Sequence, residues 1–198
     1  TAIIHYKAAL KRNPALVEAA LGLGNSLQQL GQTEGACEVF TQLINNQPNS
    51  SEAFISLGAS QFKLGRFNEA ESSLLQALRL NRGSASAYYN LGLVLNAQER
   101  FEPAAESLSM AIKLKPDYPE AFFHLGLALQ TNNLHQAAEQ ALKKSFELDP
   151  KNSLALIRLS ESKAAMGALD EAISICNSVI AAQPELSSAH YRLAMHLL

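Results

Sequence analysis

Residues Ala85 to Tyr118 read ASAYYNLGLVLNAQERFEPAAESLSMAIKLKPDY, and the rest of the chain repeats this pattern in both directions. The shift that carries Ala85 onto Pro119 aligns the whole sequence with itself without any insertion. This shift places six leucines in one column: Leu23, Leu57, Leu91, Leu125, Leu159 and Leu193. Self-similarity at a fixed period of this length is typical of a repeat architecture.

Other residue types recur in the same register. The column after the leucines holds small residues, namely Gly24, Gly58, Gly92, Gly126, Ser160 and Ala194. An alanine column comprises Ala2, Ala36, Ala70, Ala104, Ala138 and Ala172. A proline column comprises Pro14, Pro48, Pro116, Pro150 and Pro184, and only Arg82 interrupts it. So many coincidences at one period leave little room for chance.

Each repeat is predicted to form two helices. Apolar residues recur at spacings of three and four through residues 87–97 and again through 101–114, as on one face of an α-helix. Polar residues 98–100 separate the two helices, and glycines at the matching places of other repeats permit the positive φ that closes a helix. A glycine in mid-helix costs ~1 kcal/mol against alanine, so the glycine column needs a packing reason. We expect Gly92 to face Ala104 where the two helices cross.

These columns resemble the tetratricopeptide repeat, which has a leucine and a small residue in its first helix, alanine in its second and a proline at its end. The resemblance implies an all-α fold, a right-handed superhelical solenoid of antiparallel helix pairs, as one array over residues 1–198. The expected organisation is a lone second helix at 1–16, repeats at 17–50, 51–84, 85–118, 119–152 and 153–186, and a lone first helix at 187–198. Because the chain starts in mid-repeat, we expect it to be a fragment of a longer protein.

Composition and charge limit the kinds of partner and the cellular compartment that we expect. The net charge of −2 gives no electrostatic reason to expect nucleic acid, and no apolar run approaches the ~20 residues that membrane insertion needs. Cys37 and Cys176 lie four repeats apart, too far for a disulfide in a solenoid. Two free thiols indicate a reducing compartment, so we expect the cytoplasm.

Sequence patterns for catalysis are missing. The histidines form no HExxH pair, no cysteine lies near enough to complete a zinc site, and there is no Walker motif or Gly-x-Ser-x-Gly. We therefore expect no catalytic residues, no metal and no cofactor, and we expect that this fragment is not an enzyme.

The resemblance implies that the first helices line the concave side of the solenoid, where partner peptides lie. Carried over column by column, it predicts a peptide-binding groove lined by Ile55, Phe62, Tyr89, Asn90, Leu93, Phe123, His124, Leu127, Arg158 and Arg192. The alternative for the apolar column, which also holds Ile157 and Tyr191, is packing against the neighbouring repeat.

Charge along this groove predicts the polarity of a ligand. His124, Arg158 and Arg192 share one column, and we expect them to form a positive strip that takes acidic residues or a free carboxylate. The alternative is that Arg158 pairs with Glu161, three residues on along the same helix.

The function that these patterns favour is a protein interaction scaffold that binds a peptide segment. A runner-up is the substrate-recruiting or regulatory array of a larger enzyme, for example a glycosyltransferase, and a third alternative is self-association through the solenoid ends. A clamp for chaperone tails is disfavoured, because its lysine places hold Leu21, Ile55 and Tyr89. The asparagine ladder of the O-linked N-acetylglucosamine transferase array survives only as Asn90.

Overall fold

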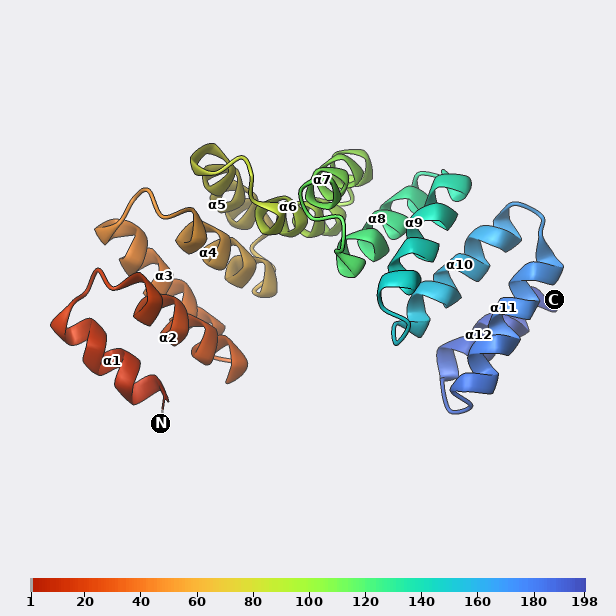
Figure 1. The fold of residues 1–198 in the computed structure, drawn as a ribbon, viewed down its shortest axis with the longest axis horizontal. Coiled ribbons are helices and arrows are strands. Elements are labelled where there is room, and N and C mark those ends of the chain that lie inside the picture. The colour runs from red at the N-terminus through yellow and green to blue at the C-terminus, as the bar shows by residue number, and fades with distance from the viewer. Residues whose placement is uncertain (1) are drawn as a thin grey trace. The chain divides into compact units, whose positions relative to one another are not determined.

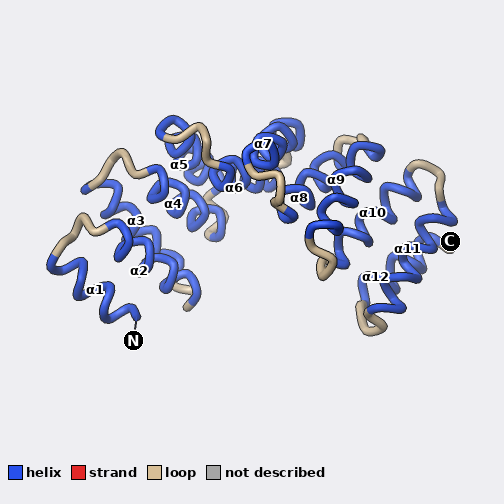
Figure 2. Tube along the Cα trace, viewed as in Figure 1, coloured by secondary structure: helices blue, strands red, loops and turns tan. Residues whose placement is uncertain are grey.

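The structure is a computed structural model that describes residues 2–198, and it is built from α-helices joined by short loops (Figure 1). In chain order the helices are α1 (Ala2–Arg12), α2 (Val17–Gln29), α3 (Thr33–Asn46), α4 (Ser51–Lys63), α5 (Phe67–Leu80), α6 (Ala85–Ala97), α7 (Phe101–Leu114), α8 (Pro119–Thr131), α9 (His135–Leu148), α10 (Ser153–Ala165), α11 (Leu169–Ala182) and α12 (Ser187–His196). Residues 2–198 contain no strand, and none of their helices has the length and apolarity of a membrane span (Figure 2).

The helices begin where the repeat register predicts. The even-numbered helices start at each predicted repeat boundary, and α3, α5, α7, α9 and α11 are the second helices. Local chemistry favours the starts of α4 and α6, because the Ser50 and Ser84 hydroxyls accept hydrogen bonds from the backbone N–H groups of Ala53 and Ala87, at 3.3 and 3.2 Å. Pro119 opens α8 at the position where proline is tolerated. Of the lone helix expected at 1–16, Thr1 lies outside the described residues, and α1 forms most of the rest.

The turns within the repeats share one backbone conformation. Gly31, Gly65 and Gly167 have φ of 74°, 74° and 81°, as the turn glycines predicted. Glu99 and Asn133 occupy the same register with φ of 59° and 58°. A glutamate with φ in this left-handed region costs roughly 1–2 kcal/mol. The geometry of the repeat therefore imposes a positive φ at Glu99, although glutamate disfavours that conformation.

The chain divides into two compact units, Thr1–Gln98 and Glu99–Leu198, and each is described by itself. Within each unit every helix packs against the next one in the chain (Figure 1). First helices of adjacent repeats also approach each other, as α2 with α4, α4 with α6, α8 with α10, and α10 with α12. No two second helices of one unit do so among the described residues. The first helices therefore form the inner side of each unit.

The core follows the register of the repeats, and the glycines of the small-residue column lie where two helices cross. A Cβ added to Gly58 would lie 2.7 Å from Leu74 Cγ and 3.2 Å from the backbone carbonyl oxygen of Ala70. A Cβ on Gly126 would lie 2.5 Å from Leu142 Cγ, and one on Gly24 would enter the Phe40 ring. At these three crossings the glycine therefore makes room mainly for a large side chain of the second helix. At Gly58 the backbone of Ala70, from the alanine column, also lies at the crossing.

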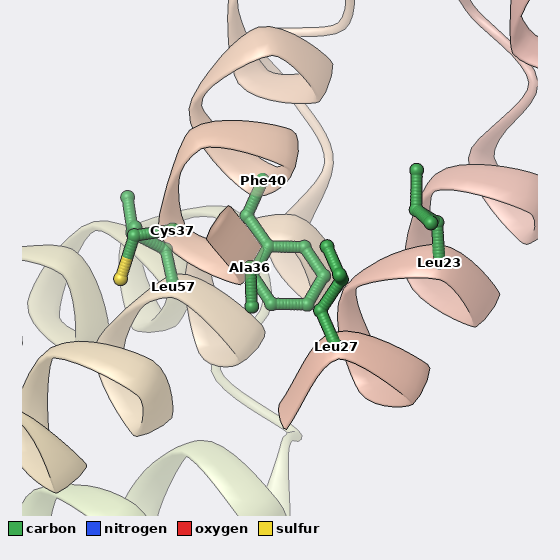
Figure 3. Packing of buried hydrophobic residues seen from close by; sticks show 6 residues of the cluster. All are labelled: Leu23, Leu27, Ala36, Cys37, Phe40 and Leu57. Atoms are coloured by element: carbon green, nitrogen blue, oxygen red, sulfur yellow. The ribbon is translucent and has the colours of Figure 1, made fainter. Parts of the chain in front are cut away.

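The first core cluster shows this packing at close range. The Phe40 ring lies beside Leu27 and Ala36, while Cys37 lies next to Leu57 (Figure 3). Burial raises the pKa of the Cys37 thiol, and the nearby charge of Glu34 adds to the effect. Cys37 and Cys176 are both buried and free, as the sequence predicted.

In the fifth repeat the same helix crossing is packed with different residues. Ser160 stands in the glycine column, and the large side chain that would face it is replaced by Cys176. Both are fully buried, and the Cys176 thiol donates a hydrogen bond to Ser160 Oγ at 3.4 Å. The added hydroxymethyl group of Ser160 thus fits because Cys176 is smaller than the side chain that faces the glycine in other repeats.

Candidate peptide-binding surface

The first unit carries half of the predicted groove residues on α4 and α6. Ile55, Phe62, Tyr89, Asn90 and Leu93 are all half-buried. Asn90 donates a hydrogen bond to the backbone carbonyl of Ser86 at 2.8 Å, one turn back in its own helix. This unit therefore offers a mixed apolar and amide surface on its inner side.

The second unit carries the other half on α8, α10 and α12. Phe123, His124, Leu127, Arg158 and Arg192 are likewise half-buried. The rings of Phe123 and His124 meet edge to face, with centroids 5.4 Å apart. These side chains lie at the surface of the inner side without projecting freely from it.

The apolar column of the groove divides between core and surface. Ile157 is 4% exposed and packs with Val179 and Ala189, so it belongs to the core. Tyr191 in the same column is 63% exposed. Tyr89 and Phe123 are half-buried and lie between these extremes. The alternative of core packing is therefore correct for Ile157 but not for the whole column.

The expected positive strip needs correction. Arg158 Nη1 donates to both carboxylate oxygens of Glu161, at 3.0 and 3.1 Å, and Arg192 Nη2 donates to Glu161 Oε1. Burial lowers the pKa of His124, against the opposing charge of Glu120, so the ring is neutral near pH 7. Two arginines around one carboxylate leave a formal charge of about +1 in place of the three positive groups expected. The pairing of Arg158 with Glu161, weighed from the sequence as the alternative, is the one observed.

A surface pocket of about 430 Å³ lies at this cluster. We name it the groove pocket, and it is lined by Leu127, Gln130, Thr131, His135, Arg158 and Glu161. Gln130 Nε2 donates to the Arg158 carbonyl at 2.7 Å and to Ser162 Oγ at 2.8 Å, which ties α8 to α10 beside the pocket. Leu127, the Arg158 guanidinium and the Glu161 carboxylate thus lie together on two helices that Gln130 connects by hydrogen bonds.

The tie between first helices is a feature that the sequence analysis missed. In the first unit Gln28 Nε2 donates to Ser60 Oγ at 2.5 Å, in the same register as Gln130 and Ser162. The recurrence of this glutamine and serine three repeats apart was the signal that could have found it.

A second pocket, of about 460 Å³, lies at the turns of the same unit and was also missed. We name it the turn pocket, and it is lined by Asn133, Leu134, His135, Gln136, Ala137 and Met166. His135 lines both pockets. Its Nδ1 is buried and has no hydrogen-bond partner within residues 2–198.

Ser160, Cys176 and His196 form a cluster of nucleophilic type. His196 Nε2 lies 3.2 Å from Ser160 Oγ, which also accepts from Cys176. Burial first, and then the charge of Arg192, lowers the pKa of His196. Because the three side chains are buried, they join α10, α11 and α12 and offer no access to a substrate. Within residues 2–198, no three His, Cys, Asp or Glu side chains are grouped so that they could hold a metal ion.

The repeat register, the paired helices and the small-residue crossings together define a tetratricopeptide-repeat array. A family model described as the cilia and flagella-associated protein 70 C-terminal domain matches residues 1–195. The chain belongs to this family. The family match reaches from α1 into α12, so it includes both units. A comparison with curated proteins finds no significant match.

Solved structures give the same fold. YrrB, described as a TPR protein with an unusual peptide-binding site, is 21% identical with a TM-score of 0.77, covering 94% of this chain and 96% of its own. A crystal structure of MamA is 32% identical with a TM-score of 0.66, covering 76% of this chain and 88% of its own. Pseudomonas aeruginosa pilF is 18% identical with a TM-score of 0.83, covering 97% of this chain and 87% of its own. The prediction of an all-α array of consecutive helix pairs is thus confirmed.

Proposed function

We propose that this chain is a non-catalytic interaction module that binds a peptide segment of a partner protein on the inner side formed by its first helices. The observation that carries the proposal is the groove pocket, where Leu127, the Arg158 guanidinium and the Glu161 carboxylate lie together at the surface. Apolar and guanidinium groups side by side are the usual anchors of recognised peptides. The likeness to YrrB, which is described as a TPR protein with a peptide-binding site, supports the same role.

The chemistry of the groove pocket indicates which segment it takes. Arg158 has 43% of its side chain exposed and bonds Glu161 through Nη1. A guanidinium has five N–H donors, so an incoming carboxylate can bind the remaining ones. The Glu161 carboxylate binds both arginines much as a ligand carboxylate would. It therefore weakens the binding of acidic segments without excluding them. We infer a segment that combines an acidic residue with apolar side chains.

The test is a selection of random displayed peptides of about 12 residues on the wild-type protein, followed by calorimetry of the enriched peptides. We expect the enriched peptides to contain Asp or Glu beside apolar residues. Glu161→Gln should bind them about threefold to tenfold more tightly, because it removes a competing carboxylate that is worth roughly 1 kcal/mol.

Two charge variants complete this test. Arg158→Glu with Arg192→Glu should weaken binding strongly and reduce its salt dependence, whereas Glu18→Lys, on α2 of the first unit, is the control and should change the affinity little. If the double reversal binds the selected peptides as well as the wild type does, the groove pocket is not the binding site. The family takes its name from a cilia- and flagella-associated protein, so proteins of that setting are the first natural partners to try.

A further inference from the structure

We infer that the bound segment does not end in the groove pocket but continues over the edge of the second unit, where it places an apolar side chain in the turn pocket. This inference rests on the proposed function, since it extends the same bound segment. The turn pocket lies where the α8–α9 and α10–α11 turns come together, at residues 132–134 and 166–168. It therefore adds a second anchor to the site outside the first-helix surface.

The turn pocket is apolar and open. Leu134 is 53% exposed and Met166 is 40% exposed, and both line it. Leu169, three residues after Met166, is also exposed, at 45%. Exposed apolar side chains that gather around a hollow mark an interaction site more often than single exposed leucines do.

The repeat register shows that this apolar pair is specific to one place. The residue before each second helix, in the column of Leu134, pairs with the residue after the next first helix, in the column of Met166. The four such pairs are Gln32 with Leu64, Arg66 with Gln98, Arg100 with Asn132, and Leu134 with Met166. Only the last pair is apolar on both sides. Where Arg66 forms an ion pair with Glu34 at 2.7 Å, the fourth repeat has Leu134, which needs no charged neighbour.

His135 connects the two pockets. This residue lines both, so a ligand side chain in one pocket and a ligand side chain in the other can belong to residues a few positions apart in a single segment. The Nδ1 of His135 is buried and has no hydrogen-bond partner within residues 2–198, so a rotation of the ring on binding would give the segment a polar group to bind. The two pockets thus adjoin at His135.

Charge decides which anchor enters which pocket. Residues 131–137 and 164–174 contain Asp170 and Glu171 but no lysine or arginine. The cation next to this stretch, Lys163, is held by Glu139 at 2.9 Å and by Glu171 at 2.8 Å. An acidic side chain therefore gains nothing in the turn pocket and goes to Arg158, while the turn pocket takes a leucine, methionine or phenylalanine. The ligand class is a linear segment with one carboxylate and one apolar anchor.

The experiment uses fluorescein-labelled peptides of about 12 residues, with one Glu and one Leu about two to five residues apart on a Gly/Ser background. Matched peptides replace the Glu by Gln or the Leu by Ser, and binding to the full chain is followed by fluorescence anisotropy. We expect the peptide with both anchors, at its best spacing, to bind about tenfold more tightly than either matched peptide.

The protein variants assign the anchors. In Leu134→Ser with Met166→Ser, the peptide with Leu should no longer bind more tightly than its Ser counterpart, whereas the peptide with Glu should still bind more tightly than its Gln counterpart. We call these two affinity differences the advantage of the Leu and the advantage of the Glu. We expect this variant to keep the fold, since Leu134 is the N-cap of α9, where serine is a preferred residue, and Met166 is 40% exposed; circular dichroism checks this. Leu30→Ser is the matched control, because Leu30 occupies the column of Met166 in the first unit, is 64% exposed and lines neither pocket, so it should change neither advantage.

The outcomes separate the inference from the proposed function. If the double serine variant retains the advantage of the Leu, the inference is wrong, and the proposed function stands as long as the arginine variants lose the advantage of the Glu. If no peptide binds the wild type up to millimolar concentration, the proposed function fails and the inference fails with it. If the serine variant instead abolishes self-association of the free protein in sedimentation, the turn pocket is filled by a second copy and the inference is overturned.

Discussion

Replacing Gly58 by alanine should destabilise the first unit although alanine is the better helix former. Gly58 lies within α4, where the exchange by itself gains about 1 kcal/mol of helix propensity. The new Cβ would lie 2.7 Å from Leu74 Cγ, a branch point, and 3.2 Å from the Ala70 carbonyl oxygen, which belongs to the backbone. Carbon atoms prefer a separation of about 3.5–4.0 Å, so α4 and α5 must shift apart.

The size of the effect follows from these opposing terms. Overpacking of a core by one carbon typically costs about 1–3 kcal/mol, and the carbonyl contact places Gly58 in the upper part of that range. After subtraction of the propensity gain, we expect Gly58→Ala to lower the free energy of unfolding by about 1–2 kcal/mol. Gly35 in α3 is the matched control, because a Cβ there meets only Leu27 Cδ1, at 3.7 Å. Gly35→Ala should raise the free energy of unfolding by a few tenths to about 1 kcal/mol.

The fifth repeat suggests the second half of this test. Since Ser160 and Cys176 replace glycine and the large residue there, Gly58→Ser should be tolerated better in combination with Leu74→Cys. Urea unfolding followed by far-UV circular dichroism measures all four corners of the cycle. We expect the double variant to be more stable than the sum of the single changes predicts, by about 1–2 kcal/mol.

Two results would overturn this account of the crossing. Equal responses of Gly58→Ala and Gly35→Ala would show that the crossing at Gly58 is not tight. Additive effects of Gly58→Ser and Leu74→Cys would show that the two positions do not share space.

Two further predictions concern the turns and the last helix. Glu99→Gly should raise the melting temperature, because relief of a positive φ in a non-glycine residue is worth about 1 kcal/mol, and Gly65→Ala should lower it by the same reasoning; a fall with Glu99→Gly would contradict the strain. His196 has a lowered pKa in the folded state, so unfolding takes up a proton as the pH falls below about 6.5, the ordinary histidine value. The protection factors of the amides in α12 should therefore fall as the pH drops below about 6.5 in the wild type but much less in His196→Gln, with Arg192, Ser160 and Glu161 the other groups facing this ring. An equal fall in both proteins would assign the change to another group.

The helices and their boundaries could be predicted from the order of the residues alone. Every first helix of a repeat begins at a predicted boundary, because starts and stops are set by local chemistry such as the serine caps and the residues of the turns. The positive φ of the turns was readable from Gly31, Gly65 and Gly167. The family was also readable, since a fixed period is written along the chain and needs no tertiary contact to be seen.

Which residues meet one another could be learned only from the packed helices. The register placed Gly58 at a crossing but could not say that Leu74 fills most of the space there, because the relative rotation of two helices depends on packing along their whole length. It placed Ile157 and Tyr191 in one column, yet one is core and the other exposed, because burial depends on which neighbours follow.

The candidate site shows the same division. Its helices and its arginines were predicted, but the charge that it presents was not, because that charge depends on Glu161 lying between Arg158 and Arg192 from two different helices. The turn pocket was missed because Leu134 and Met166 belong to different repeats and look like two unrelated exposed residues until the hairpins stack. Local chemistry is written in the order of the residues, whereas the distances that create a binding site arise only when neighbouring repeats pack.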